Sequence, residues 1–441
     1  MPKRDAIIRF TITLLLLSTP AWGETSPPRT LSLGEALQTA RTNQPQLRQA
    51  RAGTEAARAR ADEARAPLLP QVSANANYQR ATANRVIRPG ATTFSTINPL
   101  SRFDTFDFYS FGLGASQLVY DFGQTTGRWK AAKAIAQAQA ETERATLLEI
   151  DLNLRIAYFN ARAAKELLQV AQETLANQER HFVQVQGFVQ VGTQPEIDLA
   201  QARTNLANAR VQLINAQNGY ETGKAQLNQA MGIEGPTNYD VVDETLPPLE
   251  NENSPIDPLL EEALKARPEF AAFANQVRAQ ELTMRSIKGA YWPTLSVSTD
   301  LTKAGTGLGD LAWNWDANVL LSWPLFQGGL TRAQSREARA NLTNLNAQVD
   351  TFRQEVRLVV DQARLAVLAA QAAIGAAGEA VLNAKEQLRL AEKRYETGVG
   401  NIIELSDAQL ALTNAEAQKV QADYNLASAR ARLLQALGRT S

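Results

Sequence analysis

Two long proline-free stretches, residues 124–190 and 330–396, constrain this chain more than any other feature. In the first, apolar or small residues recur every seven positions, with a second heptad member between them, which predicts a coiled-coil seam. The seam comprises Leu147, Leu154, Ala161, Leu168, Leu175, Phe182 and Val189. Adding 206 to the number of Leu154 gives Val360, which opens a matching seam that ends at Tyr395. The sequence therefore predicts an internal duplication built on two helices, each about 100 Å long at 1.5 Å per residue.

Residues 1–23 are predicted to be a signal peptide. An apolar run over 10–17 follows the basic residues Lys3, Arg4 and Arg9, and we expect cleavage after Gly23. That run is too short to cross a membrane, and we expect no later helix to supply the ~18 uncharged apolar residues that a crossing requires. The chain has 0 Cys, which excludes a lipidated cysteine anchor. A membrane crossing would therefore use strands.

Each half contains two segments in which apolar and polar residues alternate. These predicted strands cover 71–80 and 106–120 in the first half, and 294–302 and 313–323 in the second. Pro70 and Pro293 separate them from preceding helices predicted over 32–66, with a break near Pro45, and over 259–290. The first hairpin has the longer loop, around Arg85, Arg88, Pro89 and Gly90, which we expect to be exposed.

Four strands cannot close a barrel, and lipid does not tolerate an open sheet edge. The alternation therefore predicts that other copies supply the missing strands. Trp313, Trp315 and Trp323 are typical of the aromatic girdle of a membrane barrel. The edge of a soluble sandwich is the alternative interpretation of the same strands.

Both long helices are predicted to end at glycine-containing turns. Gly192 and Gly398 lie 206 residues apart and occupy positions typical of a left-handed helix end. Return helices are predicted over 194–231 and 402–437, opened by capping boxes at Thr193 with Glu196 and at Asn401 with Glu404. Residues 233–258 are rich in proline and acidic residues, which indicates a linker between a first repeat, 24–232, and a second, 259–438.

This duplicated order resembles the TolC-type outer-membrane efflux or secretion channel family. The resemblance covers nearly the whole mature chain and includes the segment from Gly398 to Ala408. It implies a mainly α protein with a membrane β-barrel, in which three protomers join their long-helix hairpins into a twelve-helix tunnel. With four strands per protomer, the barrel would have twelve.

The resemblance also implies roles for ten residues. Adaptor-docking tips would comprise Val191, Gly192, Thr193, Thr397, Gly398 and Val399. Glu404 and Asp407 would form an acidic constriction, and Asp198 with Tyr395 a gating pair. A basic gating residue would lie near Gly400, where the sequence has none.

Simpler interpretations stand beside these roles. The glycines could only end helices, Glu404 could only complete a capping box, and Asp198 could only favour a helix N-terminus. Asp407 lies beyond the first turn of its helix, so a pore position is the better interpretation there. The only histidine, His181, is expected to be packed or solvated rather than a pH sensor.

The charge balance and the lack of a catalytic motif argue against some classes of function for this chain. Lys+Arg and Asp+Glu both number 45, which gives no support for nucleic-acid binding. No catalytic constellation appears, so we expect no enzyme activity, no cofactor and no metal.

The leading hypothesis is a passive homotrimeric exit duct in outer-membrane lipid. A periplasmic adaptor would couple it to an inner-membrane pump of RND or ABC type, for efflux or type I secretion. An exported coiled-coil fibre is the alternative, and drug, metal and protein substrates are not distinguished.

Overall fold

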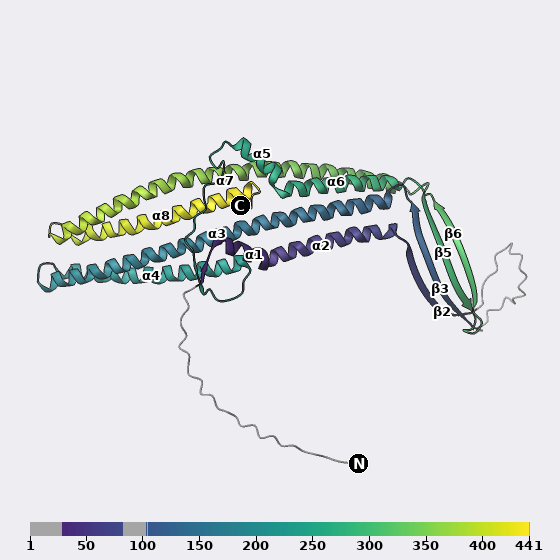
Figure 1. Ribbon diagram of the computed structural model, residues 1–441, viewed down its shortest axis with the longest axis horizontal. Helices are drawn as coiled ribbons and strands as arrows, with labels where there is room; N and C mark the ends of the chain where they lie inside the picture. The colour runs from purple at the N-terminus through teal and green to yellow at the C-terminus, as the bar shows by residue number, and fades with distance from the viewer. Residues whose placement is uncertain (1–28, 83–102, 104, 441) are drawn as a thin grey trace, which may run out of the picture.

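The computed structural model describes residues 29–82, 103 and 105–440. The predicted signal peptide and the loop around Arg85, Arg88, Pro89 and Gly90 lie outside these residues. The protein is elongated: its helices run side by side, a sheet lies at one end and two helix turns lie at the other (Figure 1). The two ends of the molecule thus have different kinds of structure.

The elements repeat in the predicted order. The first half contains β1 (Arg29–Leu31), α1 (Leu33–Asn43), α2 (Pro45–Arg65), η1 (Ala66–Leu68), β2 (Gln71–Thr82), β3 (Thr105–Tyr120), α3 (Gln124–Gln190) and α4 (Glu196–Met231). The second contains β4 (Tyr239–Val241), α5 (Ile256–Ala266), α6 (Pro268–Gly289), β5 (Thr294–Gly305), β6 (Ala312–Ser322), α7 (Leu330–Glu396) and α8 (Ile402–Ala436). Both long helices, α3 and α7, span the predicted residues.

Prolines divide the shorter helices, as predicted for Pro45. Gln44 and Arg267, each followed by a proline, have extended ψ angles of 120° and 123°. A proline ring excludes the helical conformation from the residue before it. The helix predicted over 259–290 is accordingly two helices, α5 and α6.

The sheet has the order β2-β3-β5-β6 with all neighbours antiparallel. Val72 lies opposite Ala115, and Leu113 lies opposite Leu301, which in turn lies opposite Trp315. Because directly opposed residues share a face, the apolar positions of all four strands lie on one face, as the alternation predicted, with Lys303 and Gln117 also on it towards its two ends. Among the described residues, the outer edges of β2 and β6 have no partner strand.

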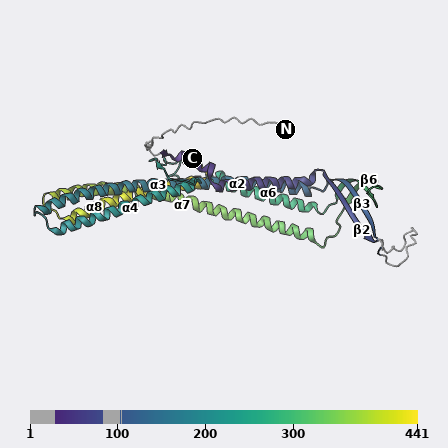
Figure 2. The ribbon, with the colours of Figure 1, turned by 90° about the horizontal axis from the view of Figure 1, so that it is seen from below.

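Two antiparallel helix hairpins, α3 with α4 and α7 with α8, form the long bundle seen in Figures 1 and 2. Predicted seam residues are fully buried at Leu154 and Ala161 in α3 and at Val360 and Val367 in α7. The heptad pattern therefore identified the packed faces of both helices.

We expected no later helix to supply about 18 uncharged apolar residues, and the longest uncharged run in α7, residues 365–378, is shorter than that. With up to two charged residues allowed, however, α7 contains an 18-residue window with a mean hydropathy of 1.7, of which 17% is buried. The middle of α7 is Ala-rich, and alanine raises hydropathy while also favouring close helix packing. One such helix is weak evidence for a membrane crossing because tightly packed helices pass the same test.

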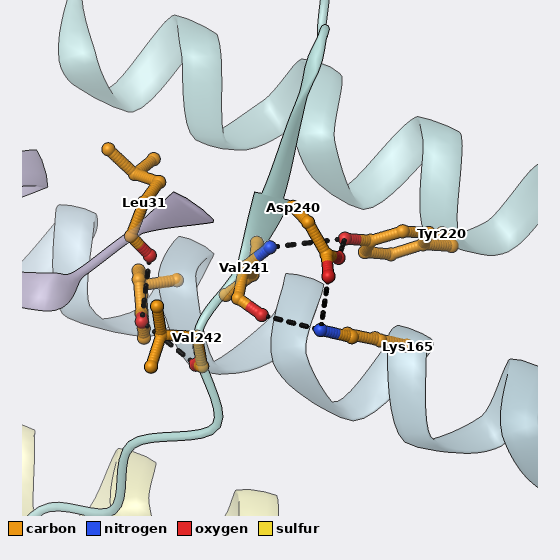
Figure 3. A network of polar contacts seen from close by, with 7 residues as sticks. Leu31, Lys165, Tyr220, Asp240, Val241 and Val242 are labelled. Carbon is orange, nitrogen blue, oxygen red and sulfur yellow. Dashed lines mark hydrogen bonds and ion pairs between the residues drawn. The ribbon is translucent and has the colours of Figure 1, made fainter. Parts of the chain in front are cut away.

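Two short strands were not predicted from the sequence, and one of them lies in the predicted linker. β1 pairs in parallel with β4, which lies within residues 233–258. Lys165 donates to Asp240 Oδ2 and to the carbonyl of Val241 at 2.7 and 2.8 Å, and the Tyr220 hydroxyl donates to Asp240 Oδ1 at 2.6 Å (Figure 3). The buried Tyr158 hydroxyl lies 3.2 Å from the Leu31 carbonyl on the β1 side. This network fixes the linker to α3 and α4 midway along the bundle.

Candidate functional site at the helix turns

The turns at the far end of the bundle are two copies of one hydrogen-bonded design. The amides of Gly192 and Thr193 donate to the carbonyls of Val189 and Phe188, at 3.0 Å each. In the second copy, the amides of Gly398 and Val399 donate to Tyr395 and Arg394 at 3.1 and 3.0 Å. This is the Schellman arrangement, which requires a left-handed residue. Gly192 and Gly398 supply it, with φ of +78° and +74°.

One of the two predicted capping boxes is wrong. The Thr193 hydroxyl donates back to the Phe188 carbonyl at 2.9 Å, so it serves the end of α3 and not the start of α4. Pro195 precedes α4, which has no side-chain cap. In the second copy, Asn401 Oδ1 accepts from the Glu404 amide at 2.8 Å, as predicted.

Both turns expose large apolar side chains. Val191 and Val399 are 73% and 71% exposed. Beside them lie Ile197 (71%) and Ile403 (64%), in the first turns of α4 and α8. Sequence analysis missed the isoleucines, although their numbers differ by the repeat offset of 206. Exposed apolar residues in equivalent places on two surface turns form a surface suited to a partner.

The structure brings Asp198 and Tyr395 into one buried layer but does not join them. Tyr395 is 1% exposed and its hydroxyl has no hydrogen-bond partner, although it is buried. Burial and the charge of Asp198 raise the pKa of Tyr395, and burial also raises the pKa of Asp198. Within one protomer the predicted gating pair therefore interacts through charge and not through a hydrogen bond.

His181 belongs to the same layer. Its imidazole contacts the Tyr395 ring edge-on and is 5% exposed, and its Nε2 has no partner. Burial lowers the pKa of His181, an effect that a hydrogen bond with Gln184 opposes. The histidine is therefore packed, which is one of the two environments expected from the sequence.

Glu404 has a partner that the sequence did not reveal. Its Oε1 lies 3.0 Å from Nε of Arg394, in the last turn of α7. A basic residue is therefore present near the turn, although Gly400 is not basic. A Cβ at Gly400 would lie 3.0 Å from the Cβ of Arg394, so glycine allows the chain to pass close to α7.

Polar contacts connect the two hairpins just inside the turns. Gln178 Nε2 donates to Gln409 Oε1 at 2.8 Å, and Asn205 Nδ2 donates to Ser406 Oγ at 3.0 Å. The Thr174 and Thr413 hydroxyls lie 3.2 Å apart. We call these three side-chain pairs the polar seam. The seam is uncharged, so its parting would expose no unpaired charge.

Asp407 lies at the margin of a groove of about 290 Å³ between α3, α4 and α8. Amide and hydroxyl side chains line this groove, including Gln178, Gln201, Asn205 and Asn208. Among the described residues, Asp407 makes no ion pair, whereas Glu404 pairs with Arg394. The two predicted constriction residues thus differ in how much of their charge is neutralised.

The chain matches the family described as "Outer membrane efflux protein" over residues 36–233 and 259–439. It is 26% identical to outer membrane protein TolC of Escherichia coli K12, over 96% of this chain and 85% of that protein. It is 24% identical to outer membrane efflux protein BepC of Brucella suis, over 97% of this chain and 89% of that protein.

Solved structures share the fold. A membrane protein from Pseudomonas aeruginosa matches with a TM-score of 0.80 and 22% identity, over 92% of this chain and 90% of the other. The Campylobacter jejuni CmeC outer membrane channel matches with a TM-score of 0.79 and 20% identity, over 92% and 85%. The arrangement of helix hairpins and sheet is therefore one already seen in outer membrane channels.

Proposed function

Because the chain belongs to the outer membrane efflux protein family, we propose that three copies form a passive exit channel with a gated, adaptor-binding tip. The sheet would lie in the outer membrane and the helices would extend into the periplasm. Export would be driven by an inner-membrane pump to which the adaptor couples the channel. The observation that carries this proposal is the combination of a largely apolar sheet face with two sheet edges that have no partner strand among the described residues.

The sheet cannot stay in lipid as a single copy. Unpaired backbone groups at the edges of β2 and β6 cost several kcal/mol each in hydrocarbon. Pairing β2 of one protomer with β6 of the next removes every edge, and three protomers give twelve strands. The apolar face, with Val319 74% exposed and Leu113 53% exposed, would then contact lipid.

The helices also leave apolar surface uncovered. On α7, Leu358, Leu365 and Leu382 are 57%, 50% and 70% exposed, although they belong to the helix with the heptad seam. On α4, Val211 and Ile214 are 56% and 62% exposed. Neighbouring protomers would bury these side chains, as expected for a closed ring of helices.

Disulfide trapping tests the assembly cleanly because the chain has 0 Cys. Ala76→Cys on β2 and a series of single cysteines along β6, from Ala312 to Ser322, would be combined in one chain. Oxidation should give a covalent trimer for the cysteine pair that matches the register of β2 in one protomer against β6 in the next. The matched control places Cys at Ala115, which lies on the internal strand β3. The trimer would be contradicted if no cysteine pair gave a covalent product larger than a dimer. It would also be contradicted if the yield of crosslinked product equalled that of the control.

The turns are the surface that we assign to the adaptor. Val191 and Ile197 in one turn and Val399 and Ile403 in the other are exposed at the very tip, on rigid, hydrogen-bonded backbone. A helical hairpin with small apolar residues at its own tip would bury them. The glycines end the helices and fix the shape of the turns. In doing so they also hold the exposed apolar side chains in position for docking.

Photo-crosslinking tests this assignment in the native host. A photoreactive phenylalanine at Val191 or Val399 should capture a periplasmic adaptor, identified by mass spectrometry. The control position is Glu261 on α5, whose side chain is 70% exposed and lies far from the turns. Ile197→Ser with Ile403→Ser should reduce the captured product while the trimer persists. Capture of the same adaptor from Glu261 with equal yield would refute a tip-specific role.

The gate would open by parting the hairpins at the polar seam. Gln178→Ala with Asn205→Ala removes two of its three contacts, and Tyr395→Phe or Asp198→Ala alters the buried layer beside it. We expect each change to raise single-channel conductance in planar bilayers. Asn177→Ala, on the same helix but outside the seam, is the control. Unchanged conductance in the seam variant would place the gate elsewhere.

A coiled-coil fibre would explain the heptads, but it would not explain why one face of the sheet is apolar and exposed. A fibre would also be extracted by mild salt, whereas a barrel requires detergent. Extraction of the protein from outer-membrane fractions therefore distinguishes the two functions.

A further inference from the structure

A pocket of about 450 Å³ lies between α3 and α6, at the sheet end of the bundle. Four basic side chains line it: Lys130 and Lys133 from α3, and Arg278 and Arg285 from α6. One acidic residue, Glu281, is also part of the lining. The pocket is far from the turns, so neither the gate nor adaptor docking accounts for it.

The four cations have no protein counter-ion. Among the described residues, none of them makes an ion pair or a side-chain hydrogen bond, and Glu281 makes none either. By contrast, Lys165 in the middle of the bundle is paired with Asp240. Like charges around one concave surface create a field that attracts an anion.

Close helix packing fixes the two walls of the pocket. A Cβ at Gly127 would lie 2.8 Å from the Cβ of Ser286, whose hydroxyl donates to the Gln124 carbonyl at 2.6 Å. With α3 and α6 in such close contact, the long basic side chains cannot point into the helix interface. They extend from its margin into the pocket, where Trp129 and Leu282 supply an apolar surface.

The sheet end of the pocket, at Arg285 and Lys130, corresponds to the level of phospholipid headgroups, whereas Arg278 lies about 16 Å along α6 from the end of that helix. Where sheet meets helices, Phe122 stacks on Trp292 with ring centroids 5.3 Å apart, as expected for an interfacial aromatic belt. Arg285 lies four residues before the end of α6, and Lys130 six residues into α3, which places them about 6 to 9 Å along the helices. The headgroup region of each leaflet extends roughly 5 to 8 Å beyond the hydrocarbon.

We propose that this pocket binds a phosphate group. Guanidinium groups of Arg278 and Arg285 can bind phosphate oxygens in pairs, and the ammonium groups of Lys130 and Lys133 neutralise its charge. The phosphate would belong either to an anionic phospholipid of the periplasmic leaflet or to a soluble phosphate compound. With a lipid, the apolar surface of Trp129 and Leu282 would contact the glycerol and upper acyl carbons.

The test uses the full-length trimer, delipidated in detergent, and two probes. Native mass spectrometry would count bound phosphatidylglycerol, and titration would measure affinities for phosphatidylglycerol and for inorganic phosphate. The pocket variant is Lys130→Gln with Arg285→Gln. The matched control is Arg332→Gln with Arg336→Gln, on the first turns of α7 at a similar distance from the sheet and outside the pocket.

We expect the pocket variant to weaken phosphatidylglycerol binding about tenfold or more, because it removes two charged groups that would contact the phosphate directly. The control should stay within about twofold. Binding of inorganic phosphate alone, with the same loss in the pocket variant, would support the site and assign its ligand to the soluble phase. Equal weakening in both variants, or no binding of either probe, would overturn the proposal. Trimer mass and conductance, measured alongside, show separately whether channel assembly is intact.

Discussion

His181 in α3 contacts Tyr395 in α7 edge-on, with ring centroids 5.4 Å apart and ring planes at 68°. The contact joins the first repeat to the second, beside the polar seam. Both side chains are buried, and His181 Nε2 and the Tyr395 hydroxyl have no partner. The layer of His181 and Tyr395 is therefore held by packing, whereas the polar seam beside it is held by hydrogen bonds.

This contact predicts a pH-dependent tip, contrary to the expectation from the sequence that His181 is not a pH sensor. Burial lowers the pKa of His181 below its usual value near 6.5. The packed state then binds fewer protons than the parted state. Its stability is fully present above pH 6.5 and falls as the pH drops from 6.5 towards the lowered pKa, by at most about 1.4 kcal/mol per pH unit. Single-channel conductance should rise between pH 7.5 and pH 5.

His181→Phe keeps the aromatic contact and should abolish this rise. The other titratable groups in the layer have separate effects: the pKa of Tyr395 is raised, far above this range, and burial raises the pKa of Asp198 from 3.8. Protonation of Asp198 would favour the packed tip, opposite in sign to His181. A conductance rise that persists in His181→Phe would show that another group is responsible.

The acidic residues at the tip should contribute unequally to ion selectivity. Glu404 is paired with Arg394, whereas Asp407 has no ion pair among the described residues. Asp407→Asn should therefore reduce cation selectivity and divalent-cation block more than Glu404→Gln does, with little change in conductance because the side-chain sizes match. Reversal potentials in a salt gradient measure this. Equal effects would mean that the Arg394 pair does not persist in the assembled channel.

Adjacent residues of β6 should respond oppositely to charge. Val319 lies opposite Val297 on the apolar face, and Asn318 lies opposite Ser298 on the polar face. Val319→Arg should destabilise the folded barrel by roughly 2 to 4 kcal/mol if it lies near the bilayer midplane. Asn318→Arg should cost less because its side chain would face water near Asp316. Urea unfolding in lipid vesicles compares them, and equal losses would contradict the assigned faces.

A buried ion pair should control how firmly the linker holds the bundle. Arg430 donates to both carboxylate oxygens of Glu252 at 2.9 Å, and Gln371 donates to the same carboxylate at 2.7 Å. Removing one member of a buried pair costs about 3 to 5 kcal/mol, so Glu252→Gln should expose residues 233–258 to chymotrypsin, which can cleave after Tyr239 and Leu249. Glu261→Gln, in an exposed pair with Lys265, should behave as the wild type.

The same pair has a pH signature. Burial raises the pKa of Glu252, but the hydrogen bond from Arg430 and the Leu249 amide outweigh this, so the net pKa is lowered. The stabilisation is therefore present above the usual value near 4.5 and is lost as the pH falls through the lowered pKa. Hydrogen-exchange protection of the backbone amides in residues 233–258 that does not change on acidification below pH 4.5 would argue against an ionised Glu252.

Features that depend on short-range periodicity were predictable from the sequence. The heptads of α3 and α7 repeat within one helix, and the alternation in β5 and β6 identifies the apolar face without knowledge of the partner strand. Gly192 and Gly398 were identified as helix ends because few other residues adopt a positive φ. The family resemblance was also present in the sequence, in the duplicated order of these elements.

Features that depend on residues far apart in the chain were decided only by the tertiary structure. β1 and β4 are three residues each, too short for a pattern, and pair across more than 200 positions. The two capping boxes looked alike, yet Thr193 bonds back to α3 while Asn401 caps α8. The contact of His181 with Tyr395 and the four cations around one pocket depend on how separate helices pack. A one-dimensional pattern specifies which face of a helix is buried, but the packing of helices determines which side chains meet there.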